Sequence, residues 1–269
     1  MIHLKSIALH RGEAEAPIAF PYSVPVIRSF EEIRFASPVT FFVGENGSGK
    51  STLLEALACA IGSITVGSDS AERDRSLRSA RELGRHLRLT WQKRTRKGFF
   101  LRAEDFFGYA KRLARMREEL ESEMRAVDDE YRGRSETAKG LAKMAYGREL
   151  DDMRRRYGPD GLDAYSHGES FLKLFQSRFI PNGLYLLDEP EAALSPMRQL
   201  AFISALKQMV EQEAQFIIAT HSPIILAFPG ATLLSFDTAP IRAVPYDDLE
   251  HVTLTKSFLN APEAYLKHL

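Results

Sequence analysis

The feature that most constrains this chain is the segment Gly44–Ser51, which has the sequence GENGSGKS. It fills the G-x-x-x-x-G-K-[ST] template of a phosphate-binding loop. The apolar, β-prone residues Val39–Val43 precede it and predict a buried strand. Thr52–Ala60 follows with the Leu and Ala content of a packed helix. A strand, a glycine-rich turn and a helix N-terminus together form a main-chain cradle for an anion.

The loop predicts a site for a nucleoside triphosphate. We expect main-chain N–H groups from Gly47 to Lys50 to bind phosphate, the Lys50 side chain to reach the terminal phosphates, and the Ser51 hydroxyl to bind Mg²⁺. The predicted nucleotide-binding residues are Gly44, Glu45, Asn46, Gly47, Ser48, Gly49, Lys50, Ser51 and Thr52.

Composition narrows the class of protein. The 36 basic and 36 acidic residues balance, so no overall charge directs the chain toward nucleic acid or membrane. The single Cys59 excludes an internal disulfide and fits a reducing compartment. No apolar run approaches the ~18 residues of a membrane helix, and the N-terminus lacks a signal-peptide pattern. We expect a soluble, cytoplasmic protein without membrane insertion.

Strands and helices alternate after the loop. Gly183–Asp188 and Phe216–Thr220 read as buried strands, and Met197–Gln212 as an amphipathic helix. This order predicts an α/β fold with a mostly parallel sheet flanked by helices. The strand and turn pattern of residues 1–43 predicts an antiparallel β portion at the N-terminus.

Residues 104–160 interrupt this order with a helical pattern. An apolar stripe from Leu113 to Tyr131 predicts a helical hairpin, with Gly133 and Gly140 as interruptions. We therefore expect one domain over 1–269 with a helical insertion at 104–160.

A basic segment precedes the insertion. Residues 72–97 hold ten Arg or Lys and three acidic residues. Residues 85–93 and 98–102 read as a strand pair, with Arg94, Arg96 and Lys97 at its hairpin tip. Such a tip could contact nucleic-acid phosphates, and an ordinary solvated basic face is the alternative.

A second motif places two acids at the end of a strand. In Leu184–Pro190 (LYLLDEP), an apolar run delivers Asp188 and Glu189 where α/β sheets bind ligands. We expect Asp188 to hold Mg²⁺ and Glu189 to act as the general base on water. Acids that only cap the next helix are the alternative.

Two further segments carry candidate phosphate contacts. His221, in the segment ATHSP, follows another buried strand and is expected beside the γ-phosphate. Ser166, in the segment SHGE, precedes a helix, where it could cap that helix or bind a second phosphate.

These four motifs, in this order, resemble those of the ABC ATPase superfamily. Residues 166–169 are similar to its signature motif, Ala193–Pro196 to its D-loop and His221 to its switch histidine. SHGE in place of LSGGQ, together with THSP, looks like the SMC and RecF-type branch. The tail, with Glu250-His251 and Ser257-Phe258-Leu259, resembles short stand-alone bacterial ATPases.

The resemblance implies an ATP-dependent, head-to-tail homodimer that sandwiches two ATP molecules with Mg²⁺. In it, Lys50 and Asp188 of one subunit share each ATP with signature residues of the other. This adds three predicted nucleotide contacts: Ser166, Gly168 and Glu169.

Two residues of the family pattern have no definite counterpart in this chain: the Q-loop glutamine and the residue that stacks on adenine. The Q-loop glutamine has no clear counterpart: Glu104 follows the expected strand, and Gln92 lies before it. Tyr22 and Arg11 are candidates for stacking on adenine by residue type alone.

The resemblance leaves the driven process open. The leading hypothesis is an SMC-like ATPase acting on DNA or a DNA-bound partner in repair or defence. The alternatives are the ATP-binding subunit of a transporter and an ATP-driven regulatory partner of a soluble effector.

Overall fold

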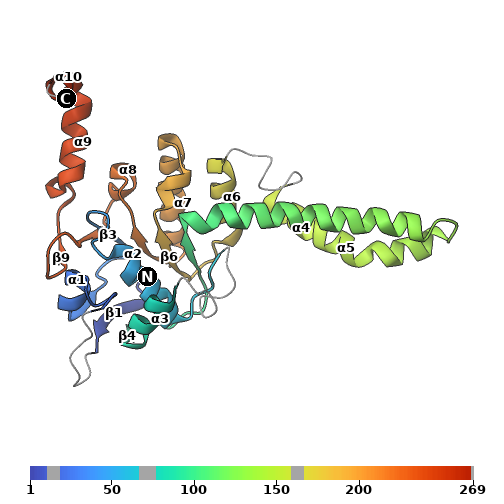
Figure 1. Ribbon diagram of the computed structural model, residues 1–269, viewed down its shortest axis with the longest axis horizontal. Helices are drawn as coiled ribbons and strands as arrows, with labels where there is room; N and C mark the ends of the chain where they lie inside the picture. Colours follow the sequence, from blue (N-terminus) through green and yellow to red (C-terminus); the bar gives the residue numbers. More distant parts are fainter. Residues whose placement is uncertain (11–18, 67–76, 159–166, 268–269) are drawn as a thin grey trace. The chain divides into compact units, whose positions relative to one another are not determined.

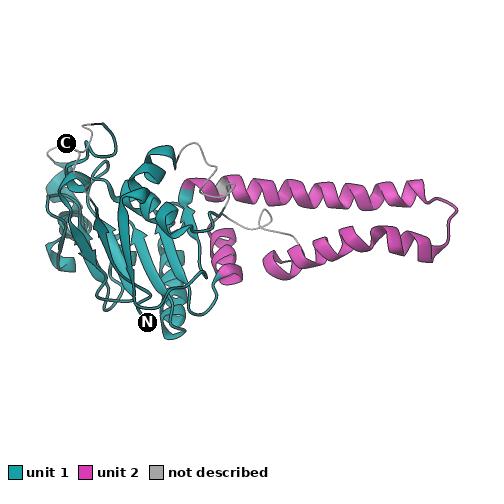
Figure 2. Ribbon diagram, turned by 90° about the horizontal axis from the view of Figure 1, so that it is seen from below, with its two compact units in different colours: residues 1–103, 179–269 teal, residues 104–178 magenta. Residues whose placement is uncertain are grey.

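The computed structural model describes residues 1–10, 19–66, 77–158 and 167–267. The chain divides into two compact units (Figure 2). The first comprises residues 1–103 and 179–269, and the second residues 104–178.

A six-stranded sheet forms the centre of the first unit, in the order β5-β6-β7-β3-β8-β9 (Figure 1). The first five strands are parallel, and only β9 is antiparallel to its neighbour. This confirms the predicted α/β fold with a mostly parallel sheet. The strands are β3 (Val39–Val43), β5 (Phe100–Arg102), β6 (Leu184–Asp188), β7 (Gln215–Ala219), β8 (Thr232–Ser235) and β9 (Arg242–Ala243).

A second, three-stranded sheet is antiparallel and has the order β2-β1-β4. It consists of β1 (Leu4–Leu9), β2 (Glu32–Arg34) and β4 (Leu87–Trp91), as the predicted N-terminal β portion requires. The buried side chain of Gln215, on β7, joins it to the central sheet. Its Oε1 accepts hydrogen bonds from the main-chain N–H groups of His3 and Leu4, both at 2.8 Å.

Helix α2 (Lys50–Ile61) follows β3 and buries its Leu and Ala face in the main core, which is why the residues after the glycine loop are apolar. The short helix α1, at Pro25–Ser29, is not predicted by the sequence pattern. The other helical segments of this unit are α3 (Arg78–Arg85), η2 (Pro190–Ala193), α7 (Pro196–Glu211), α8 (Pro223–Leu226), η3 (Tyr246–Asp248), α9 (Glu250–Asn260) and α10 (Pro262–Leu266).

The second unit is helical, with α4 (Ala103–Glu130, beginning one residue before the unit), α5 (Glu136–Tyr157) and α6 (His167–Arg178). Gly133 lies in the turn between α4 and α5, but α5 runs through Gly140, so the interruption predicted there is wrong. Hydroxyls of Tyr109 and Tyr157, 2.8 Å apart, join these two helices. In the described part of the chain, no helix combines the length and apolar content needed to cross a bilayer.

The hairpin expected around residues 94–97 is wrong. β4 pairs with β1 in the antiparallel sheet, whereas β5 pairs with β6 in the central one. The exposed residues Arg94, Arg96 and Lys97 therefore lie on a connection between sheets. At its end, Leu184 donates a main-chain hydrogen bond to the Lys97 carbonyl at 2.9 Å.

Gly98 allows this close approach, and its replacement gives a test of the connection. A Cβ at Gly98, which has φ +118°, would lie 1.8 Å from the Leu184 carbonyl oxygen. We expect Gly98→Ala to lower the free energy of unfolding by more than about 2 kcal/mol, measured by urea denaturation.

Gly140→Ala is the matched control, because a Cβ at this helical position meets no atom within 4 Å. It should be neutral or stabilising by up to about 1 kcal/mol. Equal stabilities of the two variants would contradict the close approach at Gly98.

Candidate functional site

The loop after β3 has the backbone of a phosphate cradle. Gly49 is the N-cap of α2 in a left-handed conformation with φ +102°. A Cβ there would lie 2.9 Å from Val24 Cγ1, so the position requires glycine. No described side chain caps α2, and its first turn holds no acidic residue. The helix N-terminus thus favours an anion.

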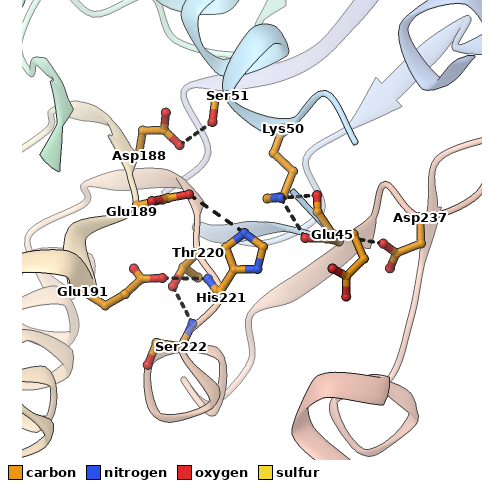
Figure 3. A network of polar contacts seen from close by, with 11 residues as sticks. Glu45, Lys50, Ser51, Asp188, Glu189, Glu191, Thr220, His221, Ser222 and Asp237 are labelled. Atoms are coloured by element: carbon orange, nitrogen blue, oxygen red, sulfur yellow. Dashed lines mark hydrogen bonds and ion pairs between the residues drawn. The ribbon is translucent and has the colours of Figure 1, made fainter. Parts of the chain in front are cut away.

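Lys50 is 4% exposed and folds back over the loop (Figure 3). Its Nζ donates to the carbonyl oxygens of Gly44, at 2.7 Å, and Glu45, at 2.9 Å. Burial lowers the pKa of Lys50, and the carboxylates of Glu189 and Asp188 oppose that shift. The main-chain N–H of Ser48 donates to the Glu45 carbonyl at 3.2 Å, so it takes part in the loop's own turn.

Asp188, the last residue of β6, faces the start of α2. The Ser51 hydroxyl donates to its Oδ1 at 3.0 Å. Asp188 is 8% exposed, and burial raises its pKa to about 7, against the opposing hydrogen bond from Ser51. A hydroxyl and a carboxylate are oxygen ligands of the type that Mg²⁺ prefers. The pair therefore fits the predicted Mg²⁺ site.

Glu189 follows in an unusual conformation, with φ 49° and ψ 49°. A left-handed non-glycine residue costs on the order of 1–2 kcal/mol and often occurs at functional sites. Its main-chain N–H donates to the Ala219 carbonyl at 2.9 Å. Its half-exposed side chain reaches toward His221, with Oε1 3.9 Å from Nε2.

His221 follows the end of β7, beside Glu189. Burial lowers the pKa of this histidine, and nearby Lys50 acts in the same direction. The Nε2 atom is buried and has no hydrogen-bond partner among the described residues. The structure thus brings together Lys50, Ser51, Asp188, Glu189 and His221 at the carboxyl edge of the parallel sheet (Figure 3).

Sequence reasoning missed two acidic residues at this edge. Glu191, in η2, accepts a hydrogen bond from the main-chain N–H of His221 at 2.7 Å, and burial raises its pKa. Asp237 accepts one from the main-chain N–H of Glu45, also at 2.7 Å. Asp237 lies just after β8, which pairs with β3, so the strand-end rule that identified Asp188 also applies to it.

The remaining predicted contacts lie in the second unit or outside the described residues. Gly168, which is buried, and Glu169 lie in the first turn of α6, in the second unit, while Ser166 is not described. Of the Q-loop candidates, Glu104 is exposed in α4 and Gln92 is exposed just after β4.

Neither adenine-stacking candidate is supported. Tyr22 is buried, with its ring edge-on to His86 at 6.1 Å between centroids. Arg11 lies outside the described residues.

A pocket of 440 Å³ opens in front of the loop. It is lined by the loop itself, by His221 and by residues of α1 and of the C-terminal part of the unit: Pro25, Val26, Gly44, Glu45, Asn46, Gly47, Ser48, His221, Phe236, Asp237, Ala239, Leu249, Glu250 and His251.

Two protein-family models match the chain. One, described as "AAA domain", matches residues 26–144 and includes the glycine loop. The other, described as "AAA domain, putative AbiEii toxin, Type IV TA system", matches residues 170–227 and includes Asp188, Glu189 and His221. No curated protein matches the chain in sequence.

Solved structures resemble it at low identity. They include cbiO1 from Clostridium perfringens, part of the ABC transporter complex cbiONQ, at 15% identity and a TM-score of 0.45, covering 100% of this chain and 99% of that one. The ABC transporter cassette MJ0796 is 17% identical, with a TM-score of 0.43, and the match covers 91% of this chain and 99% of that one. A third match is the Smc head domain from Pyrococcus furiosus, bound to the C-terminal domain of ScpA. It is 12% identical, with a TM-score of 0.44, and the match covers 97% of this chain and 100% of that one.

The contact of Glu191 with His221 gives a test of how this edge is held together. Glu191→Ala should lower the free energy of unfolding by about 1–3 kcal/mol, because it leaves the His221 N–H without its acceptor. Glu191→Gln keeps an acceptor oxygen, so its free energy of unfolding should fall by less. Urea denaturation of both variants measures the difference, and a Gln variant as unstable as the Ala variant would contradict this role.

Proposed function

We propose that this chain, an ABC-type ATPase with SMC-like motifs, binds ATP with Mg²⁺ and hydrolyses it. One observation supports this most strongly: the hydrogen bond between Ser51 and Asp188. It joins the start of the loop helix to the end of an acid-bearing strand 137 positions away in sequence. That pairing is what a shared Mg²⁺ site requires.

The five residues predicted from the motifs have separate roles in catalysis. Lys50 exchanges its carbonyl partners for the terminal phosphates, and Ser51 and Asp188 hold Mg²⁺. When bound, Mg²⁺ supplies charge neutralisation at the phosphates. Glu189 orients the attacking water and accepts its proton. His221 donates a hydrogen bond to the γ-phosphate. Catalysis is then mainly positioning and electrostatic stabilisation.

The proposal includes an ATP-dependent homodimer, as the motif resemblance implies. Ser166, Gly168 and Glu169 of one subunit would contact the ATP held by the loop of the other. Dimerisation then completes the site and acts as the switch.

For the driven process, we keep DNA or a DNA-bound partner as the leading proposal. The exposed basic residues Arg94, Arg96 and Lys97 support it. A role as regulatory partner of a soluble effector in defence is the second candidate, favoured by the toxin–antitoxin description of the model matching 170–227. The transporter-subunit alternative has no such specific support.

Glu189→Gln is the central test of the proposal. This variant should bind Mg-ATP and dimerise, yet hydrolyse ATP about 100-fold or more slowly, because the amide cannot accept the proton. Steady-state phosphate release measures the rate, and light scattering coupled to size exclusion measures the dimer. Normal turnover by this variant would refute Glu189 as the base.

Lys50→Ala is its control, since it should lose ATP binding and therefore form no ATP-dependent dimer. An Ala variant that still dimerised with ATP would contradict the proposed phosphate site.

The basic connection is tested with a triple variant, Arg94→Gln, Arg96→Gln and Lys97→Gln. Duplex DNA should stimulate phosphate release by the unaltered protein, and the variant should lose this stimulation while keeping its basal rate. DNA that affects neither protein would exclude the DNA hypothesis and favour the effector candidate.

A further inference from the structure

The first turn of helix α9 carries a histidine that lines the candidate nucleotide pocket. His251 lines the same 440 Å³ cavity as the glycine loop and His221. Its Nε2 atom is buried and has no hydrogen-bond partner among the described residues. Buried polar atoms are nearly always hydrogen-bonded, so this one calls for a partner that enters the pocket.

The histidine is held in place by its neighbours. Leu249 and Val252, on either side of it in sequence, are 5% and 0% exposed. Just before α9, the Tyr246 hydroxyl donates to the Pro223 carbonyl at 2.9 Å and fixes η3 against α8. The ring therefore belongs to a packed part of the unit, although α9 continues into an exposed tail.

Charged groups of the glycine loop and of the sheet edge act on the ring. Burial lowers the pKa of His251; Asp237 and Glu45 oppose this, and Lys50 adds to it. His251 in turn lowers the pKa of His221. The ring thus lies within electrostatic range of Lys50 and His221, the two residues assigned to the terminal phosphates.

The ring can serve an anion as a hydrogen-bond donor. A neutral imidazole still has one N–H group to donate. The nearby Asp237 carboxylate is already engaged, with Oδ1 accepting from the main-chain N–H of Glu45 and Oδ2 from the Ser235 hydroxyl at 3.2 Å.

We propose that His251 donates a hydrogen bond from Nε2 to the terminal phosphate of the bound nucleoside triphosphate. Helix α9 would then complete the pocket and distinguish a triphosphate from a diphosphate. This inference rests on the proposed function, because it requires that the glycine loop binds a nucleotide.

The test compares two nucleotides on four proteins: the unaltered chain, His251→Ala, His251→Gln and the control His10→Ala, which removes an exposed histidine outside the pocket. Isothermal titration calorimetry with Mg²⁺ measures the affinities for β,γ-imido-ATP and ADP. His251→Ala should weaken binding of the triphosphate about 10-fold or more and leave ADP within about 2-fold, because only the triphosphate has the γ-oxygen. His251→Gln, which keeps an N–H donor, should recover part of the loss, and His10→Ala should change neither affinity.

The outcomes separate this inference from the proposed function. If the unaltered chain binds both nucleotides and His251→Ala binds them equally well, the inference is overturned and the function stands. Equal loss of both affinities in His251→Ala would also overturn it, since the ring would then have a structural role. If the unaltered chain binds neither nucleotide, both proposals fail.

Discussion

The parallel pairing of β3 with β7 and β8, and of β7 with β6, is the constraint on which the rest of the site depends. Parallel strands end at the same edge, so residues far apart in sequence meet there. Asp188 is the last residue of β6, and the glycine loop, His221 and Asp237 come shortly after the ends of β3, β7 and β8. Nearly every strand residue is buried, and the core thereby holds the edge rigid.

That edge concentrates groups that water would normally solvate. Lys50 and Asp188 are both nearly inaccessible to solvent. Burial lowers the pKa of Lys50 and raises the pKa of Asp188, and both shifts favour the neutral form of the side chain. The neighbouring opposite charges and the Ser51 hydroxyl oppose these shifts. A site of this kind is well suited to charged ligands, since low-dielectric surroundings strengthen each interaction with them.

The predictable part of the fold was the part with local signals. Val39–Val43 matched its strand residue for residue because an apolar β-prone run ended at a glycine template. The predicted bounds of β6, β7 and α7 were off by one residue. The pairing of β4 with β1 was not predictable, because two strands close in sequence look like a hairpin until tertiary partners are known. Gly140 was misread because a single exposed glycine weakens a helix without ending it.

The residues of the candidate site also fall into two groups, those that the motifs predicted and those that only the folded structure reveals. Lys50, Ser51, Asp188, Glu189 and His221 belonged to motifs with a chemical reason for each residue, and they lie together. Glu191 could not be found from spacing, because its significance comes from a hydrogen bond that only folding creates. The sequence named His251 only as part of the tail resemblance, and its place in the pocket comes from folding.

The contact of Lys50 with its own loop has a consequence for selectivity. Two carbonyl oxygens already occupy the ammonium group, so they act as an internal competitor for every incoming anion. A weakly charged solute gains little by displacing them, whereas a polyphosphate replaces them with several full negative charges. The loop would therefore bind highly charged anions in preference to weakly charged ones.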